Sequence, residues 1–258
     1  MAAESKAEPK LSLRGIVKRF GGLTAVDHVD MDVYPGDVVG LVGDNGAGKS
    51  TLIKCVSGVY QADEGEVAFE GQTVRFSRPI DARNAGIETI YQDLALAGNL
   101  DVSANIFLGR EIIKRYLGGA ITTLDEKQML NESRQVIDSL DIRLPNFGEQ
   151  IDRLSGGQRQ AVAIARAVYW DARLMIMDEP TNNLGVPEQR KVLDLIHTLR
   201  DQNVPVILIS HTLPDVFAVT NRIVIMHRGR KVAEKKTDET DSQEVVQYMV
   251  GALDDFAH

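Results

Sequence analysis

The sequence predicts an α/β fold, and three observations support this prediction. The apolar, β-branched run Val38–Val42 is typical of a buried central strand, and it leads through a glycine-rich loop into a helix predicted at Lys49–Val56. Strand and helix patterns alternate again from Leu174 onward. Between these stretches, residues from about 93 to 169 have largely helical character. We therefore expect an α/β core that is interrupted by a helical insertion.

Antiparallel strands are predicted before this core. Leu11–Phe20 and Ala25–Tyr34 are strand-like and flank a Gly21-Gly22 turn, and Gly65–Phe69 and Thr73–Phe76 follow. The remaining strands are expected at Gly86–Tyr91, Leu174–Asp178, Val204–Ser210, Arg222–His227 and Lys231–Lys235. The remaining helices are expected at Asp125–Leu140, Arg159–Val168, Pro187–Gln202, Thr212–Val219 and Glu244–Val250.

Composition excludes several classes of protein. The net charge of −8 argues against a nucleic acid as the main partner, because such binders usually carry a basic field. No apolar run approaches the roughly 18 residues that cross a bilayer. Residues 1–10 lack a secretory apolar region and are expected to form a polar tail. The single cysteine, Cys55, is consistent with a reducing compartment, and we expect the cytoplasm.

The glycine-rich loop after Val42 carries the strongest motif. Gly43-Asp-Asn-Gly-Ala-Gly-Lys-Ser50 fits G-x-x-x-x-G-K-[ST], a loop whose backbone N–H groups and following helix surround phosphate oxygens. Lys49 is expected to neutralise β- and γ-phosphate charge, and the Ser50 hydroxyl to bind Mg²⁺. The predicted nucleotide-binding residues are Gly43, Asp44, Asn45, Gly46, Ala47, Gly48, Lys49, Ser50 and Thr51. The alternative, a chance glycine-rich turn, does not explain the strand before the loop and the helix after it.

Two acidic residues follow the apolar strand Leu174–Met177. Asp178 and Glu179 at its tip suit a Mg²⁺ ligand beside a base that polarises water. An isolated Asp-Glu pair could equally be a helix N-cap or a solvated acidic pair. The phosphate loop upstream favours the functional interpretation.

A second anion site is predicted at Leu154-Ser-Gly-Gly-Gln158, which opens the helix Arg159–Val168. Ser155 can cap this helix, and Gly156 and Gly157 can expose backbone N–H groups. Without the other motifs, this stretch would be an ordinary turn before a helix.

The order of these three motifs resembles that of the ATP-binding-cassette (ABC) family of ATPases, whose signature is Leu-Ser-Gly-Gly-Gln. The resemblance extends from about Leu11 to Gly251. It implies one ABC ATPase domain over 11–251, with a P-loop NTPase core, an N-terminal antiparallel β-subdomain and an α-helical subdomain inserted at about 93–169.

The resemblance also implies roles for individual residues. Asp178 matches the Walker B aspartate and Glu179 the catalytic glutamate. Gln92 matches the Q-loop glutamine that reaches Mg²⁺ and the attacking water, and His211 matches the switch histidine at the γ-phosphate. Phe20 matches the aromatic residue that stacks on adenine. Taken alone, a glutamine is weak evidence, and a histidine after a strand is more often structural than catalytic. For an aromatic residue that ends a strand, a role in the core is a substantial alternative.

In this family the signature serves the nucleotide of a second subunit. Ser155, Gly156, Gly157 and Gln158 are therefore expected to contact ATP held by a second copy, and one copy of each motif implies a homodimer. The chain departs from the family pattern at Gly185, where most ABC ATPases carry an aspartate.

Gly109-Arg-Glu111 and Thr181–Val186 look like ATPases of bacterial monosaccharide importers of the ribose or fructose type. This resemblance implies an ATPase with ATP and Mg²⁺ as cofactors, bound to a membrane permease on the inner face of the cell membrane. A periplasmic solute-binding protein would deliver the solute to the permease. The alternatives are an importer ATPase for another solute, an exporter, or a soluble ABC ATPase of DNA repair or translation, which the acidic charge disfavours.

Overall fold

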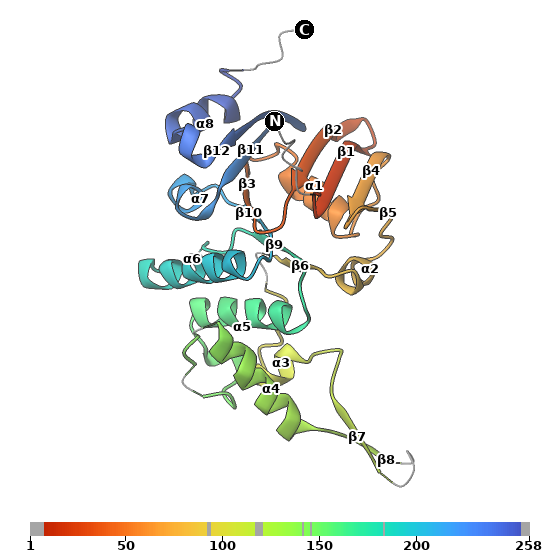
Figure 1. Ribbon diagram of the computed structural model, residues 1–258, viewed down its shortest axis with the longest axis vertical. Coiled ribbons are helices and arrows are strands. Elements are labelled where there is room, and N and C mark those ends of the chain that lie inside the picture. Colours follow the sequence, from red (N-terminus) through yellow and green to blue (C-terminus); the bar gives the residue numbers. More distant parts are fainter. Residues whose placement is uncertain are drawn as a thin grey trace, which may run out of the picture. The chain divides into compact units, whose positions relative to one another are not determined.

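The computed structural model describes residues 8–91, 94–116, 121–140, 142–144, 146–182 and 184–253 (Figure 1). The chain forms two compact units. The first comprises the described residues up to Thr89, Arg173–Pro180 and the described residues from Ile196 onward. The second comprises Ile90–Ala172 and Thr181–Leu195. Among the described residues, no helix is both long enough and apolar enough to cross a membrane.

A six-stranded, mainly parallel sheet lies at the centre of the first unit. Its strands, in spatial order, are β12 (Arg230–Lys236), β11 (Arg222–His227), β3 (Val38–Gly43), β10 (Val206–Ile209), β9 (Leu174–Asp178) and β6 (Ile87–Ile90). All six residues of β3 are buried between its parallel neighbours β10 and β11, as its apolar sequence predicts. The predicted α/β class is confirmed.

Alternate residues of the central strands bury two different surfaces. In β3, Val39 and Leu41 belong to a core that also contains residues of α1 (Lys49–Val56). Val42 packs instead with residues of α7 (Leu213–Val219) and α8 (Ser242–Met249). Helices thus bury both faces of β3, as is typical of a central strand in an α/β sheet.

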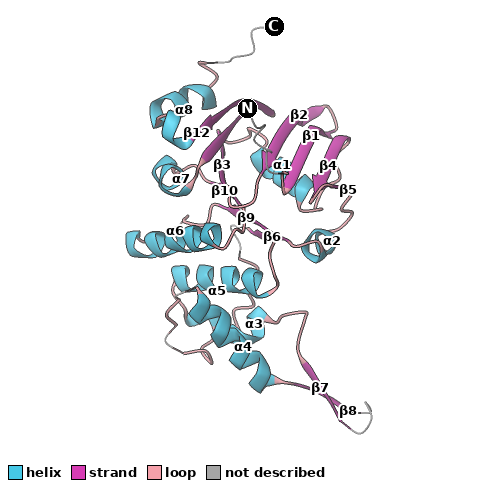
Figure 2. Cartoon of the chain, in the orientation of Figure 1, coloured by secondary structure: helices cyan, strands magenta, loops and turns pink. Residues whose placement is uncertain are grey.

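The predicted antiparallel strands form a separate four-stranded sheet in the same unit (Figure 2). Its order is β2 (Leu23–Val33), β1 (Leu11–Phe20), β4 (Glu64–Phe69) and β5 (Gln72–Val74). Phe20 pairs directly with Leu23, so Gly21-Gly22 makes the predicted tight turn. A short helix, α2 (Pro79–Asn84), was not among the predicted elements.

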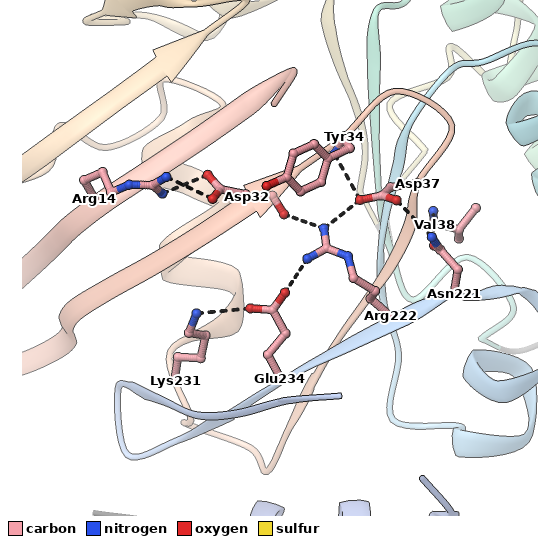
Figure 3. A network of polar contacts seen from close by, with 9 residues as sticks. All are labelled: Arg14, Asp32, Tyr34, Asp37, Val38, Asn221, Arg222, Lys231 and Glu234. Atoms are coloured by element: carbon pink, nitrogen blue, oxygen red, sulfur yellow. Dashed lines mark hydrogen bonds and ion pairs between the residues drawn. The ribbon is translucent and has the colours of Figure 1, made fainter. Parts of the chain in front are cut away.

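A polar network connects the start of β3 to β11 (Figure 3). Arg222 donates to the Asp37 carboxylate at 2.6 Å and to the Asp32 carbonyl at 2.7 Å, and it also pairs with Glu234. Asn221 donates to Asp37 at 2.9 Å and accepts a 2.7 Å bond from the backbone N–H of Val38. Because a mostly buried ion pair needs several partners, these bonds favour one register of β3 against β11.

Helices dominate the second unit. They are α3 (Val102–Ile106), α4 (Glu126–Ser139), α5 (Gly156–Tyr169) and the first part of α6 (Val186–Asp201), with a 3-10 turn at Ile151–Arg153. The helices α3, α4 and α5 pack against one another. The boundaries of the predicted domain, 11–251, and of its helical part, about 93–169, stay a prediction.

The second unit also contains a β-hairpin that the sequence analysis did not predict. Strand β7 (Ile113–Tyr116) pairs with β8 (Ile121–Leu124), and Figure 2 shows both strands in magenta. The signal was present: β-branched residues flank Gly118-Gly119, a typical turn pair. The helical pattern on both sides of this short stretch masked it.

Candidate nucleotide-binding site

The carboxyl ends of neighbouring parallel strands bring three predicted motifs to one edge of the sheet. Gly43 at the end of β3 lies opposite Met226 of β11. Ile209 of β10 lies opposite Leu41 of β3 on one side and Asp178 of β9 on the other. The loops that follow β3, β9 and β10 therefore emerge beside one another, where ligands bind in open α/β sheets.

The loop between β3 and α1 requires glycine for steric reasons. Gly43, Gly46 and Gly48 have φ angles of 152°, 81° and 98°, which L side chains rarely adopt. A Cβ atom on Gly43 would lie 2.3 Å from the Met226 carbonyl oxygen, and one on Gly48 would lie 2.4 Å from that of Ala25. The motif thus lets the loop pass close to two other strands while it turns into α1.

Lys49 covers this loop at the start of α1. Its Nζ donates to the carbonyls of Gly43 at 2.7 Å and Asp44 at 3.0 Å. Burial lowers the pKa of Lys49, and the charges of Glu179, Asp178 and Asp44 oppose that shift. The ammonium group is therefore held at the loop within the field of the acidic pair.

A cavity of about 530 Å³ adjoins the loop. Its lining residues are Phe20, Leu23, Thr24, Ala25, Asn45, Gly46, Ala47, Gly48, Lys49, Ser50, Thr51, Arg228 and Gly229. The structure thus brings the predicted aromatic residue Phe20, which is 43% exposed, to the same cavity as the phosphate loop. Sequence reasoning did not find Leu23, Thr24, Ala25, Arg228 or Gly229, because only the tertiary structure makes them neighbours of the loop.

Glu179 directly follows β9 and has a strained backbone. Its φ of 52° lies in the left-handed region, and its N–H donates to the Ile209 carbonyl at 2.9 Å. Such strain in a non-glycine residue is typical of functional sites. His211 Nδ1 lies 2.8 Å from Glu179 Oε2, so the structure brings these two predicted residues together.

Burial raises the pKa of the neighbouring Asp178, and the charge of Glu179 raises it further. Lys49 and Lys54 act in the opposite direction. Two adjacent carboxyl groups in a partly buried place form a site that an added cation would stabilise.

The predicted signature residues lie in the second unit. Ser155 Oγ accepts a 3.3 Å bond from the N–H of Gln158, and the Gln158 side chain accepts a 2.9 Å bond from the N–H of Ser155. This reciprocal pair caps α5. A Cβ atom on Gly156 would lie 2.6 Å from a Leu184 methyl group, and one on Gly157 would lie 2.8 Å from Glu188.

These glycines therefore have a packing role within the second unit, in addition to the anion binding expected of them. Gln92, the predicted Q-loop residue, lies outside the described residues. The functional roles of all the named site residues stay predictions.

Known proteins resemble this chain closely. The model of the ABC transporter family matches residues 26–182. A xylose/arabinose import ATP-binding protein of Sulfolobus acidocaldarius is 46% identical, over 93% of this chain and 93% of that protein. A fructose import ATP-binding protein of Rhizobium meliloti is 45% identical, over 95% of each. A ribose import ATP-binding protein of Escherichia coli O157:H7 is 39% identical, over 94% of this chain and 47% of that protein.

Solved structures share the fold. An ATP-binding cassette of an ABC transporter superposes with a TM-score of 0.82 at 26% identity, covering 95% of this chain and 98% of that one. A cassette described in its ADP conformation has a TM-score of 0.77 at 25% identity, covering 95% of this chain and 96% of that one.

Proposed function

Since the chain belongs to the ABC transporter family, we propose that it is the ATP-hydrolysing, energy-coupling subunit of a monosaccharide importer. The observation that carries the enzymatic part is the Glu179–His211 pair beside Lys49 and Asp178, at the strand edge that bears the phosphate loop. The observation that carries the transport part is the sequence identity of 46% and 45%, over most of the chain, to two sugar import ATP-binding proteins.

ATP binds in the cavity beside α1. Its terminal phosphates lie in the glycine loop, where Lys49 offsets their charge, and its adenine lies toward Phe20. Stacking accepts any base, so we expect weak discrimination between ATP and GTP.

The residues present fit Mg²⁺. This ion prefers one or two protein oxygen ligands together with substrate phosphates, and the Ser50 hydroxyl and the Asp178 carboxylate are such ligands. Gln92 is the third expected ligand. The raised pKa of Asp178 reflects burial and the repulsion from Glu179, both of which a cation counteracts. When bound, Mg²⁺ supplies charge stabilisation on the phosphate oxygens.

Glu179 acts as the general base. It takes a proton from the water that attacks the γ-phosphorus, while the bond from that phosphorus to the β–γ bridging oxygen breaks and yields ADP and phosphate. His211 orients the Glu179 carboxylate through the 2.8 Å contact. The hydrogen bond from Glu179 N–H to Ile209 holds the backbone of the base against β10.

Two copies of the chain act together. Ser155, Gly156, Gly157 and Gln158 of one copy contact the nucleotide of the other, at the N-terminus of α5. The dimer binds the cytoplasmic side of a membrane permease. A periplasmic solute-binding protein delivers the solute to that permease. The named relatives import different sugars, so the class of solute we propose is a monosaccharide. An importer ATPase for another solute is the second candidate.

Affinity purification tests this proposal. A tagged Glu179→Gln protein is expressed in its native host and purified with Mg·ATP from detergent-solubilised membranes, and co-purifying chains are identified by mass spectrometry. A Lys49→Ala version, which we expect to bind ATP more weakly, serves as the control. We expect a polytopic permease with the first protein and less of it with the second. Recovery with ribosomal or DNA-repair proteins in the soluble fraction only would contradict the proposal.

A further inference from the structure

The turn between β11 and β12 carries an arginine at the nucleotide cavity, and the geometry points to a role for it. We propose that Arg228 is a further nucleotide-binding residue whose guanidinium binds the α-phosphate of the nucleotide. This inference rests on the proposed function, since it places Arg228 in the same cavity as Phe20 and Lys49.

The first observation is the strained backbone of Arg228. His227 pairs with Arg230, so Arg228 and Gly229 form a two-residue hairpin turn with φ angles of 44° and 84°. Turns with two positive φ angles favour Asn, Asp or Gly at the first position, because an arginine there is strained. Backbone strain in a non-glycine residue is often found at functional sites, and a ligand contact at Arg228 would account for it.

The second observation is that the turn is attached to the phosphate loop. The N–H of Gly229 donates to the Ala47 carbonyl at 3.0 Å, and the Gly229 carbonyl accepts a 2.8 Å bond from the N–H of Asp27 in β2. A Cβ atom on Gly229 would lie 3.1 Å from the Ala25 carbonyl oxygen. Arg228 is therefore held between the phosphate loop and the start of β2, which follows Phe20.

The third observation is that the guanidinium of Arg228 is free. Arg228 is exposed, and within the described ranges no residue forms a hydrogen bond or ion pair with its side chain. Arg230, two residues later, instead pairs with Asp27 at 2.6 Å and faces a different cavity. Of these two arginines, only Arg228 both lines the nucleotide cavity and has a guanidinium that is not paired with a described residue.

The position of Arg228 indicates that its guanidinium binds the α-phosphate and not another phosphate of the nucleotide. In the proposed binding mode the base of the nucleotide lies at Phe20 and its terminal phosphates lie at Lys49. The hairpin turn packs against Ala25 and Ala47, and we place it beside the middle of the bound nucleotide. The α-phosphate is the anionic group of a nucleotide in that middle region. Arginine binds phosphate oxygens through paired N–H groups, and its charge strengthens those bonds.

The test replaces Arg228 without straining the turn. Arg228→Asn removes the charge and suits the left-handed backbone, so it should fold at least as well as the natural protein. Arg230→Asn is the matched control, with the same change in the same hairpin. Dissociation constants are measured by calorimetry for ATP and ADP and by displacement of a fluorescent nucleotide for AMP and adenosine.

For Arg228→Asn we expect about tenfold weaker binding of ATP, ADP and AMP, as for the loss of one charge-assisted contact. Adenosine binding and the melting temperature should not fall. Arg230→Asn should bind all four ligands as the natural protein does.

Three results would overturn the inference. ATP affinity of Arg228→Asn within twofold of the natural protein would remove Arg228 from the site. An equal loss for adenosine would place the contact at the base. A loss of affinity together with a lowered melting temperature would make the role structural. Failure of the natural protein itself to bind ATP would refute the proposed function instead, and with it the premise of this inference.

Discussion

His211 Nδ1 lies 2.8 Å from Glu179 Oε2, so two residues that follow neighbouring parallel strands meet at one edge of the sheet. The Glu179 side chain is 16% exposed, whereas that of His211 is 63% exposed. The Glu179 carboxylate is thus shielded, whereas the His211 ring faces solvent. Glu179 also has a strained φ of 52°, which persists only where surrounding contacts hold the residue in place. Such strain is typical of functional sites.

Replacing Glu179 separates binding from hydrolysis. Glu179→Gln keeps the shape of the side chain but removes the base, so we expect ATP hydrolysis to fall at least roughly a hundredfold with ATP affinity retained. Phosphate release and ATP binding are measured on the same preparation. Glu239→Gln, in which an exposed surface glutamate is changed, is the control. Near-normal turnover in Glu179→Gln would contradict the role of this residue.

Lys49 is expected to contribute to binding. Lys49→Ala removes the cation held at the phosphate loop, and ATP affinity should fall at least tenfold, as for loss of a charge-assisted contact. Lys236→Ala is the control, because Lys236 is an exposed lysine that pairs with Glu239 on the surface. The dissociation constant for ATP is measured at equilibrium for both variants. An unchanged affinity in Lys49→Ala would count against the phosphate-binding role.

His211 is expected to act mainly on the rate of hydrolysis. His211→Ala removes the contact that orients Glu179, so kcat should fall about tenfold or more, whereas the dissociation constant for ATP should change less. The control is His28→Ala, because His28 is similarly exposed and also pairs with a carboxylate, that of Asp27. Equal kcat values for the two variants would show that the His211–Glu179 contact has no catalytic consequence.

Glu70 should make stability depend on pH. Its hydrogen bond with Lys10 lowers the pKa of Glu70, burial opposes this shift, and Arg173 lowers the pKa further. The stabilisation is therefore present above the ordinary glutamate pKa of about 4.3 and is lost as pH falls through the lower folded value. The melting temperature of the natural protein should exceed that of Glu70→Gln at pH 7. The difference should shrink in acid, and a constant difference would contradict the assignment.

Cys55 should be chemically inert in the folded protein. Burial raises the pKa of its thiol to about 11, so little thiolate forms at neutral pH. We expect a thiol reagent to label Cys55 slowly in the native protein and quickly once denaturant unfolds the chain. Rapid labelling under native conditions would contradict this prediction.

Local patterns in the sequence carried much of the fold and of the site. The strand Val38–Val42, the loop to Ser50 and the helix Lys49–Val56 are adjacent in the chain, so their motif could be identified without any tertiary information. The hairpin at Gly21-Gly22 was predictable for the same reason. The unpredicted β7–β8 hairpin shows the limit of this approach, since a short strand pair between helices has little periodicity of its own.

The sequence by itself therefore determined the α/β class, the phosphate loop and the resemblance to one family. Only the tertiary structure placed Arg228 and Ala25 beside the phosphate loop, joined Arg222 to Asp37, and turned the Glu179 backbone into the left-handed region. The physical reason is the strand order, in which β3 lies between β10 and β11, two strands far along the chain. Contacts across that sheet depend on the packing of distant segments, which no local pattern of residues records.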